Sequence, residues 1–222
     1  MNAAMNAAVW PSPWPAAGTW PPWARWLTEL RVDVHLPEDR VQAELDALNQ
    51  RRDRLLGAAE ALPPLAGMSA HLRVWVRQAD GEFFVYVMDP YAGQMVAYVT
   101  LNRLVELNRQ ADRLFRAPHT KVAVPWRRRG IASAIYRWWL DSGQSLMTGA
   151  RQSPAARGLW LSMARHYRMR YVSIDNRQVH DLGDHAPEGT LERLNTRAVL
   201  LGRGRELADG AGGPRWVSPA PT

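Results

Sequence analysis

The chain has 222 residues, of which 46% are hydrophobic, so its length suits one α/β core with extensions rather than two comparable domains. It contains no cysteine, which excludes disulfides, thiolate metal sites and a cysteine nucleophile. The formal charge of +7 and the pI near 10.5 favour anionic partners, which include nucleic acid, anionic lipid and a nucleotide cofactor.

The first 34 residues differ in composition from the rest of the chain. They interleave tryptophans with prolines, which resists regular structure but offers large apolar surfaces. We expect an arm over residues 1–34 that packs on the domain's own apolar surface or docks on a partner or second subunit, so a homodimer is one alternative. The domain itself is expected over residues 35–205, followed by a disordered Gly- and Pro-rich tail over residues 206–222.

Cellular location follows from what the sequence lacks. No apolar run approaches the roughly 20 residues that span a bilayer, and the N-terminus has no secretory pattern. We therefore expect a cytoplasmic protein without membrane contact.

The first half of the domain shows one helical pattern and then three strands. Apolar residues at three- and four-residue steps predict one amphipathic helix from Pro37 to about Ala61. Two turn-forming stretches then separate three apolar segments, which predicts an antiparallel meander. Residues 102–115 follow with a short helical pattern. The three predicted strands are Leu72–Arg77, Phe83–Met88 and Met95–Leu101.

The second half changes to alternating strands and helices, which predicts an α/β fold. A polar stretch, Asp175–Leu194, is expected to form a loop before a last strand at Thr196–Leu201. The alternating elements are a strand at Lys121–Val124, a helix at Ile131–Asp141, a strand at Ser145–Thr148, a helix at Pro154–His166 and a strand at Tyr171–Ile174.

The segment Arg127–Ala132 joins the first of these strands to the first helix. Gly130 removes a side chain where a ligand can approach the backbone, and the free N–H groups of the helix start beside it. Three adjacent arginines and the positive end of the helix dipole favour a pyrophosphate. The alternative is an Arg-rich solvated loop before a helix.

The order of these motifs resembles the GNAT superfamily of acetyltransferases, whose phosphate-loop signature is Gln/Arg-x-x-Gly-x-Gly/Ala. Arg127, Gly130 and Ala132 fill that signature. A second family motif, Asn-x-x-Ala-x-x-Leu-Tyr, is matched with two substitutions by the segment from Ser153 to Trp160. The resemblance spans roughly residues 83–174.

The resemblance implies a mixed, mostly antiparallel central sheet flanked by helices, with a splayed strand pair at the cofactor site. It implies acetyl-CoA as the acyl donor, attacked directly by an acceptor amine, with the pantothenate arm against the backbone of the splayed strand and the pyrophosphate over the Arg/Gly turn. The residues implied for cofactor binding are Thr120, Val122, Val124, Arg127, Arg128, Arg129, Gly130, Ile131, Ala132, Ser133, Ser153 and Trp160.

The chain departs from the family at the residue that commonly protonates the leaving thiolate, because Trp160 stands where the motif has tyrosine. Tyr167 and Tyr136 are candidate replacements, with packing or a structural hydrogen bond as the alternative for each. His119 and Asp89 are candidates for the base, against ordinary strand-end and turn roles.

The histidines and carboxylates lack metal-ligand spacing, so we expect no metal site. The leading hypothesis is an acyl-CoA-dependent N-acyltransferase whose acceptor is a small-molecule amine, a protein lysine or a nucleic-acid-borne amine. The alternatives are a nucleic-acid-binding or DNA-modification-associated protein, supported by the basic charge and the tryptophans, and an inert GNAT-like core that serves as an interaction protein.

Overall fold

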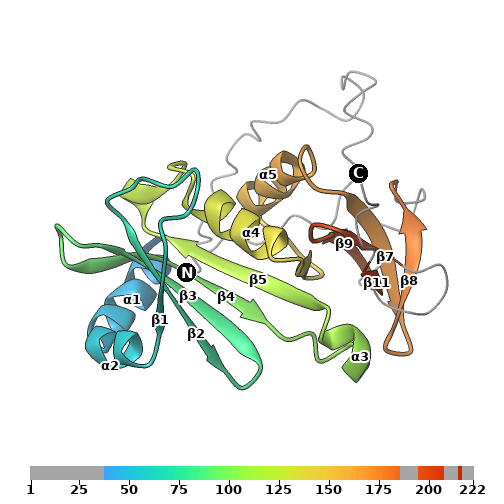
Figure 1. The fold of residues 1–222 in the computed structure, drawn as a ribbon, viewed down its shortest axis with the longest axis horizontal. Helices are drawn as coiled ribbons and strands as arrows, with labels where there is room; N and C mark the ends of the chain where they lie inside the picture. Colours follow the sequence, from blue (N-terminus) through green and yellow to red (C-terminus); the bar gives the residue numbers. More distant parts are fainter. Residues whose placement is uncertain (1–37, 186–194, 208–214, 217–222) are drawn as a thin grey trace, which may run out of the picture.

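The computed structural model describes residues 38–185, 195–207 and 215–216, and the expected N-terminal arm lies outside them (Figure 1). Nine strands of these residues form one sheet in the order β1-β2-β3-β4-β5-β6-β9-β7-β8, and β10 and β11 form a small second sheet. Of the neighbouring pairs, only β5 and β6 run parallel. The predicted fold class, a mixed and mostly antiparallel sheet flanked by helices, is confirmed.

The elements follow one another along the chain as Figure 1 labels them. The helices are α1 (Glu38–Asn49), α2 (Arg52–Gly57), α3 (Arg109–Asp112), the 3-10 helix η2 (Val124–Trp126), α4 (Ile131–Asp141) and α5 (Pro154–Met163). The strands are β1 (Glu60–Leu62), β2 (Arg73–Ala79), β3 (Glu82–Asp89), β4 (Gln94–Asn102), β5 (Phe115–Val122), β6 (Ser145–Met147), β7 (Met169–Asp175), β8 (Gln178–Gly183), β9 (Thr196–Leu200), β10 (Arg205–Glu206) and β11 (Arg215–Trp216).

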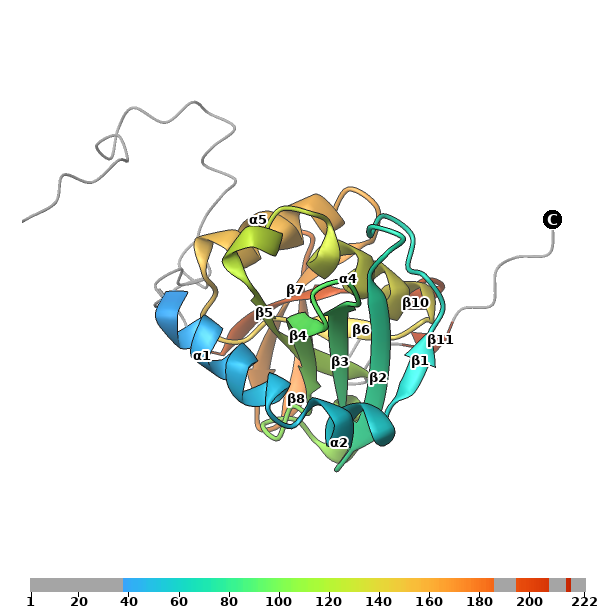
Figure 2. The ribbon, with the colours of Figure 1, turned by 90° about the vertical axis from the view of Figure 1, so that its left-hand side faces the viewer.

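Helices cover both faces of the sheet (Figure 2). On one face, α4 and α5 pack on inward side chains of the meander such as Val85 and Val99, which are fully buried. On the other face, α1 and α2 pack on Tyr86, Met88 and Tyr98. Successive side chains of a strand point to opposite faces of the sheet, and helices cover both faces. The central strands are therefore apolar at nearly every position rather than at every second one.

The single helix predicted over Pro37–Ala61 is wrong, because the chain forms α1, α2 and the strand β1 there. Asn49 ends α1 by turning its side chain to the sheet: its Oδ1 accepts from the N–H of Met95 at 2.7 Å and its Nδ2 donates to the Met95 carbonyl at 3.4 Å. This is a contact between residues 46 positions apart. Helical spacing within one segment carries no information about it.

The helix predicted over residues 102–115 is also shorter than expected. Only α3 forms, capped by the side chain of Asn108, and β5 begins at Phe115, six residues before its predicted start. Asp112 explains the irregular approach, because its buried carboxylate accepts from the N–H of Leu104 at 2.8 Å and pairs with Arg103 at 2.9 Å. The local chain is organised by this carboxylate rather than by helix periodicity.

In the second half the alternation of strands and helices is confirmed, and α4 has the predicted bounds. The polar stretch Asp175–Leu194 departs from expectation because β8 pairs with β7 through a turn at Asn176 and Arg177, both with positive φ. The sequence of β8 resembles that of a loop because β8 is an edge strand and carries polar side chains. One of them, Asp181, forms an ion pair with Arg170 on β7. Within the expected disordered tail, Arg215–Trp216 pairs with Arg205–Glu206.

The link between Asn49 and β4 is testable. Changing Asn49 to Ala removes both partners from the backbone of Met95, which is 2% exposed, and leaves polar groups buried without a bond. We expect a loss of about 1–3 kcal/mol of unfolding free energy, read from urea denaturation. Gln50→Ala, at the exposed neighbouring position, is the matched control and should change stability by less than about 0.5 kcal/mol.

Candidate functional site

The candidate site begins where β5 and β6 separate. Their parallel pairing is confined to Phe115 with Ser145 and Arg116 with Leu146, while β9 pairs along the other edge of the short strand β6. Pro118 comes two residues after the last pair and has no N–H to donate, which suits the strand to an unpaired edge. Beyond residue 116, the β6 side of β5 has no strand partner within the described part of the chain. The predicted splayed pair is confirmed.

Backbone groups of β5 line this opening. The N–H of Ala123 donates to the carbonyl of Val96 on β4 at 2.9 Å, so the odd-numbered residues of β5 direct their backbone groups to β4. The backbone groups of Thr120 and Val122 consequently face the opening. Arg127 donates from Nε to the Val122 carbonyl at 3.3 Å. An extended ligand can therefore pair with this edge as an added strand would.

Val124 does not belong to this edge, although the sequence suggested that it did. Instead it starts the 3-10 helix η2, its side chain is 46% exposed, and its carbonyl accepts from the N–H of Arg127 at 3.2 Å. The strand thus ends at Val122, and the chain turns sharply toward α4.

The turn that follows is a concave run of backbone amides. Arg128 has φ 60° and Gly130 has φ 79°, both left-handed. The N–H of Ala134 makes the first bond of the helix, to the Gly130 carbonyl at 2.9 Å, so the N–H groups of residues 131–133 have no carbonyl partner within the helix. Successive amides in alternating conformations form a nest, and this one lies at the N-terminus of the 11-residue helix α4. The turn can therefore hold an anion.

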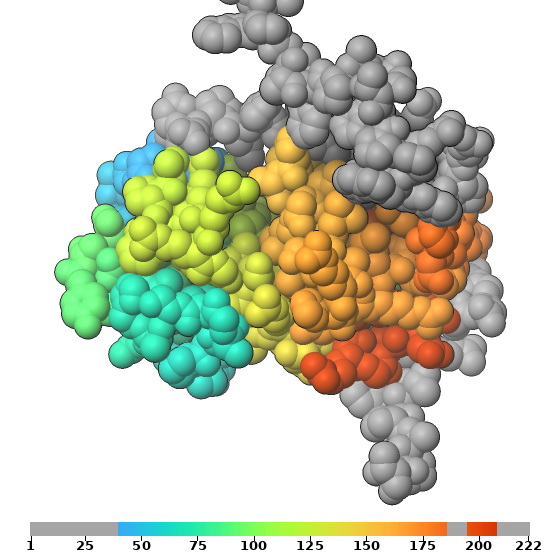
Figure 3. Space-filling model, turned by 90° about the horizontal axis from the view of Figure 1, so that it is seen from above, coloured from blue at the N-terminus to red at the C-terminus, as the bar shows by residue number. Residues whose placement is uncertain are grey.

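Three consecutive arginines, Arg127–Arg129, belong to this turn, and all three are exposed. Arg127 reaches back to β5, while Arg129 stacks its guanidinium over the ring of Trp126 at 4.9 Å. Figure 3 shows this segment and that of α5 on the same face of the molecule. The charge and the amides together match a pyrophosphate better than a single carboxylate.

The sequence suggested that a glycine is needed at position 130 so that a ligand can approach the backbone, whereas the structure shows a packing requirement for it. A Cβ at this position would lie 2.5 Å from the carbonyl oxygen of Gly67, in the connection between β1 and β2. Gly67 in turn lies against the guanidinium of Arg137 on α4. Gly130 is therefore required by packing within the protein and by its positive φ, whatever the turn binds.

A polar network lies on the α1 face of β5, next to the opening. Lys121 is buried, with its side chain 2% exposed, and its Nζ lies 3.3 Å from Oε2 of Glu44 on α1. The hydroxyl of Tyr98 donates to the same carboxylate oxygen at 2.7 Å. The Tyr98 bond holds the pKa of Glu44 below its ordinary value, with the Lys121 charge adding to this against desolvation. Burial, followed by the Glu44 contact, raises the pKa of Tyr98.

His119 lies two residues before Lys121 and hence on the same face of the strand. Its side chain keeps contact with solvent, yet loss of water on its protein side lowers the pKa of His119 below 6.5. The Lys121 ammonium lowers it further, and the Glu44 carboxylate partly opposes this. The lowered pKa favours the neutral imidazole of His119, the form that can accept a proton at the opening.

The opposite face of β5 is closed. Thr120 directs its hydroxyl to that of Tyr136 on α4, 3.1 Å away, and Tyr136 is only 3% exposed. Burial raises the pKa of Tyr136 to about 12, against the opposing effect of the Thr120 bond. These contacts give Tyr136 a packing role under the strand rather than a position from which it releases a proton.

Tyr167 is far from the opening. Its hydroxyl donates at 2.9 Å to Asp141, which ends α4 just before β6, on the side where β5 and β6 are paired. Burial and the Asp141 contact raise the pKa of Tyr167. The structure thus does not bring either candidate tyrosine to the splayed edge as a free acid.

The remaining candidates have structural partners. Asp89 accepts from the N–H of Tyr91 at 2.9 Å and so shapes the turn between β3 and β4. Ser153 caps α5 by accepting from the N–H of Ala156, and Trp160 is 3% exposed within the main core. These contacts explain why the three residues occur where they do without reference to a ligand.

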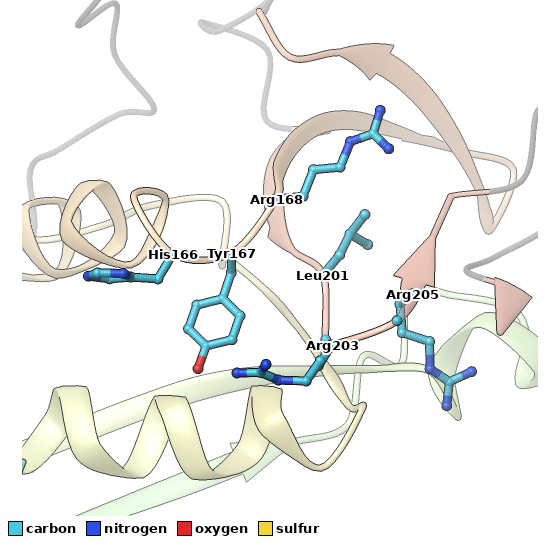
Figure 4. Close-up of a pocket in the computed structure, with 8 residues that line it drawn as sticks. His166, Tyr167, Arg168, Leu201, Arg203 and Arg205 are labelled. Atoms are coloured by element: carbon cyan, nitrogen blue, oxygen red, sulfur yellow. The ribbon is translucent and has the colours of Figure 1, made fainter. Parts of the chain in front are cut away.

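A cavity of about 210 Å³ lies at the paired end of the two strands (Figure 4). Tyr167 and Arg203 point toward each other across it and both bond Asp141. The guanidinium groups of Arg168 and Arg205 point in different directions, so the cavity does not gather its positive charge around one point. Its lining residues are His166, Tyr167, Arg168, Leu201, Gly202, Arg203, Gly204 and Arg205.

Among the described residues, no three or more histidine, aspartate or glutamate side chains group as metal ligands. None of the helices described is both long enough and apolar enough to cross a membrane.

No family model matches the chain, and no curated protein matches it either. Among solved structures, the chain is similar to a GCN5-related N-acetyltransferase from Kribbella flavida, with 14% sequence identity and a TM-score of 0.33. The match covers 71% of this chain and 90% of that one. A likeness this distant establishes neither family nor activity, and the function proposed below rests on the geometry of the site.

Sequence reasoning missed Glu44, Tyr98 and Lys121. The first two lie far from Lys121 in sequence, and only the sheet register and α1 bring them together. The sequence contained one signal that could have found Lys121. It is the only lysine in the sequence, and the other 27 of the 28 lysine and arginine residues are arginines.

Gly130 gives a direct test of the turn. Changing Gly130 to Ala forces a Cβ into the Gly67 carbonyl and a left-handed conformation on an L residue. We expect Gly130→Ala to lower the unfolding free energy by about 1–3 kcal/mol, measured by thermal unfolding. Gly158→Ala is the control: it lies in α5 with open space around it, so alanine should be neutral or stabilising by about 0.5–1 kcal/mol.

Proposed function

We propose that the chain is an acyl-CoA-dependent N-acyltransferase acting at the opening between β5 and β6. The observation that supports this best is a strand edge without a strand partner in the described residues, followed directly by a turn with three exposed arginines and the N-terminal amides of α4. An extended amide-containing arm fits the first part, and a pyrophosphate fits the second. Acetyl-CoA carries both groups in that order.

The reaction is a direct transfer. The neutral acceptor amine attacks the thioester carbonyl, so a C–N bond forms and the C–S bond breaks. His119 takes the proton that the amine loses. The thiolate that leaves is the conjugate base of a thiol with an ordinary pKa near 8.5, so it can take its proton from water. Trp160 in place of tyrosine is therefore compatible with turnover.

Coenzyme A binding tests the proposal. We expect isothermal titration calorimetry to detect binding of coenzyme A to the full chain. Arg129→Ala removes a charged donor next to the nest and should weaken binding roughly tenfold, which corresponds to about 1.4 kcal/mol. Arg54→Ala, at an exposed position on α2 and on the other side of the sheet, should leave the affinity unchanged. Absence of binding to the unaltered chain contradicts the proposal.

The position of Tyr167 yields a second expectation. Because its hydroxyl is bonded to Asp141 at the paired end of the strands, Tyr167→Phe should change kcat for acetyl transfer to a reactive amine less than about twofold. A loss of a hundredfold or more, of the size that general acids contribute, would restore Tyr167 as the proton donor. His119→Gln should show a loss of that size.

A ladder of rings beside the turn favours nucleic acid as a second candidate partner. The centroid of His71 lies 5.7 Å from that of Tyr91 and 5.8 Å from that of Trp126, and the guanidinium of Arg129 lies 4.9 Å from the Trp126 centroid. Tyr91 is 87% exposed, so a base can stack on it while the arginines contact phosphates.

We expect the mobility of a single-stranded oligonucleotide to shift in low salt if this surface binds nucleic acid, and Tyr91→Ala to weaken that shift. Binding should fall steeply as salt is raised. No shift at about 50 mM salt eliminates the candidate, and Val105→Ala, another exposed hydrophobic residue, is the matched control.

A further inference from the structure

The lysine behind the opening is unusual for this chain. Lys121 is its only lysine, and its side chain is 2% exposed, whereas the other strongly basic residues are arginines. A buried ammonium lowers the stability of the fold unless an opposite charge pairs with it. The burial of Lys121 therefore calls for a paired carboxylate and for a role that only a buried charge can fill.

The partner is a carboxylate fixed from two directions. Glu44, on α1, lies 3.3 Å from Lys121 Nζ and accepts the Tyr98 hydroxyl at 2.7 Å. Tyr98 lies directly opposite Lys121 in the register of β4 and β5. Two strands and a helix therefore hold the ammonium in one place, and Glu44, with 36% of its side chain exposed, lies at the outer side of the network.

The ammonium has a neighbour for which charge matters. His119 is two residues earlier on the same face of β5, about 7 Å away along the strand. The residue opposite His119 on β4 is the uncharged Thr100. Lys121 lies on the same face of β5 as His119, and Glu44 reaches that face from α1, where it pairs with Lys121.

We propose that Lys121 and Glu44 are positioning residues for His119: they hold a buried ion pair on the face of β5 that carries the imidazole, and its two charges tune, in opposite directions, how readily the imidazole accepts a proton. This inference rests on the proposed function for the role of His119 as base. The electrostatic part does not, because it concerns only the free protein.

The two charges should move the imidazole in opposite directions. Removing a positive neighbour favours protonation, so in Lys121→Met the pKa of His119 should rise by about half a unit to one unit. Removing a negative neighbour disfavours protonation, so in Glu44→Gln the pKa should fall by a similar amount.

The measurement is an NMR titration of the histidine ring signals of the full chain between pH 4.5 and 8.5, with the His119 signal assigned by its loss in His119→Gln. Opposite shifts in the two variants support the inference. Shifts of the same sign, or shifts below about 0.2 units in both, overturn it, because mere loosening of the fold moves the ring toward ordinary exposure in either variant.

Two further variants keep the test decisive. If Lys121→Met does not fold, Lys121→Gln takes its place. The side chain of Glu44 is 36% exposed, so Glu44→Gln should fold, and the direction of its His119 pKa shift can still be measured. Tyr98→Phe keeps both charges while removing the hydroxyl, so the His119 pKa should move less than in either charge variant.

Activity adds an independent readout. In Lys121→Met the acidic limb of kcat/KM against pH should move to higher pH by the same amount as the ring pKa, with coenzyme A affinity within twofold of the unaltered chain. Failure of coenzyme A to bind the unaltered chain refutes the proposed function alone. Lack of opposite ring shifts refutes this inference alone.

Discussion

Everything at the candidate site depends on how early the β5–β6 pairing ends. Two residue pairs hold the strands together, because β6 ends at Met147 and Pro118 has no N–H to donate on β5. The sheet is nevertheless continuous, because β9 lies between β6 and β7 and carries the pairing onward. An internal strand edge is thus left unpaired without exposing the edge of the whole sheet. This constraint turns an ordinary mixed sheet into one with a backbone-lined opening, and α4 then brings its amide-rich end to the mouth of that opening.

The two faces of β5 differ, which assigns them different roles. On the α4 face, Thr120 and the buried Tyr136 close the strand from below. On the α1 face, His119 keeps contact with solvent beside a fixed ion pair. An acceptor that reaches a thioester in the opening therefore has to approach from the α1 face, because the other is filled by core. The titratable groups lie on that same side. Because side chains alternate between the two faces of β5, the residues that pack against α4 and the titratable residues on the α1 side lie on opposite faces of one strand.

The sequence predicted what is encoded locally. The bounds of α4 were correct because Gly130, the apolar spacing and the polar stop at the other end lie within one segment, and the cap of α5 at Ser153 is equally local. The errors came from tertiary contacts. Asn49 ends α1 only because Met95 is there to bond, and β8 is polar only because it is an edge. Tyr167 was expected on nearly the same helical face as Trp160, but α5 ends at Met163, and the Tyr167 hydroxyl bonds Asp141 at the paired end of β5 and β6.

Gly130 shows why a motif and its explanation have to be separated. The signature residue is present, yet the atom that demands a glycine is the Gly67 carbonyl, and the left-handed φ would favour glycine in any case. For the proposed function, the contribution of this glycine is indirect: the left-handed turn that it allows precedes the free N–H groups at the start of α4. Packing against Gly67 and the proposed anion site then depend on the same turn. Under that proposal, ligand affinity and stability are coupled at Gly130, whereas at Arg129, which lies over the ring of Trp126, they can be separated.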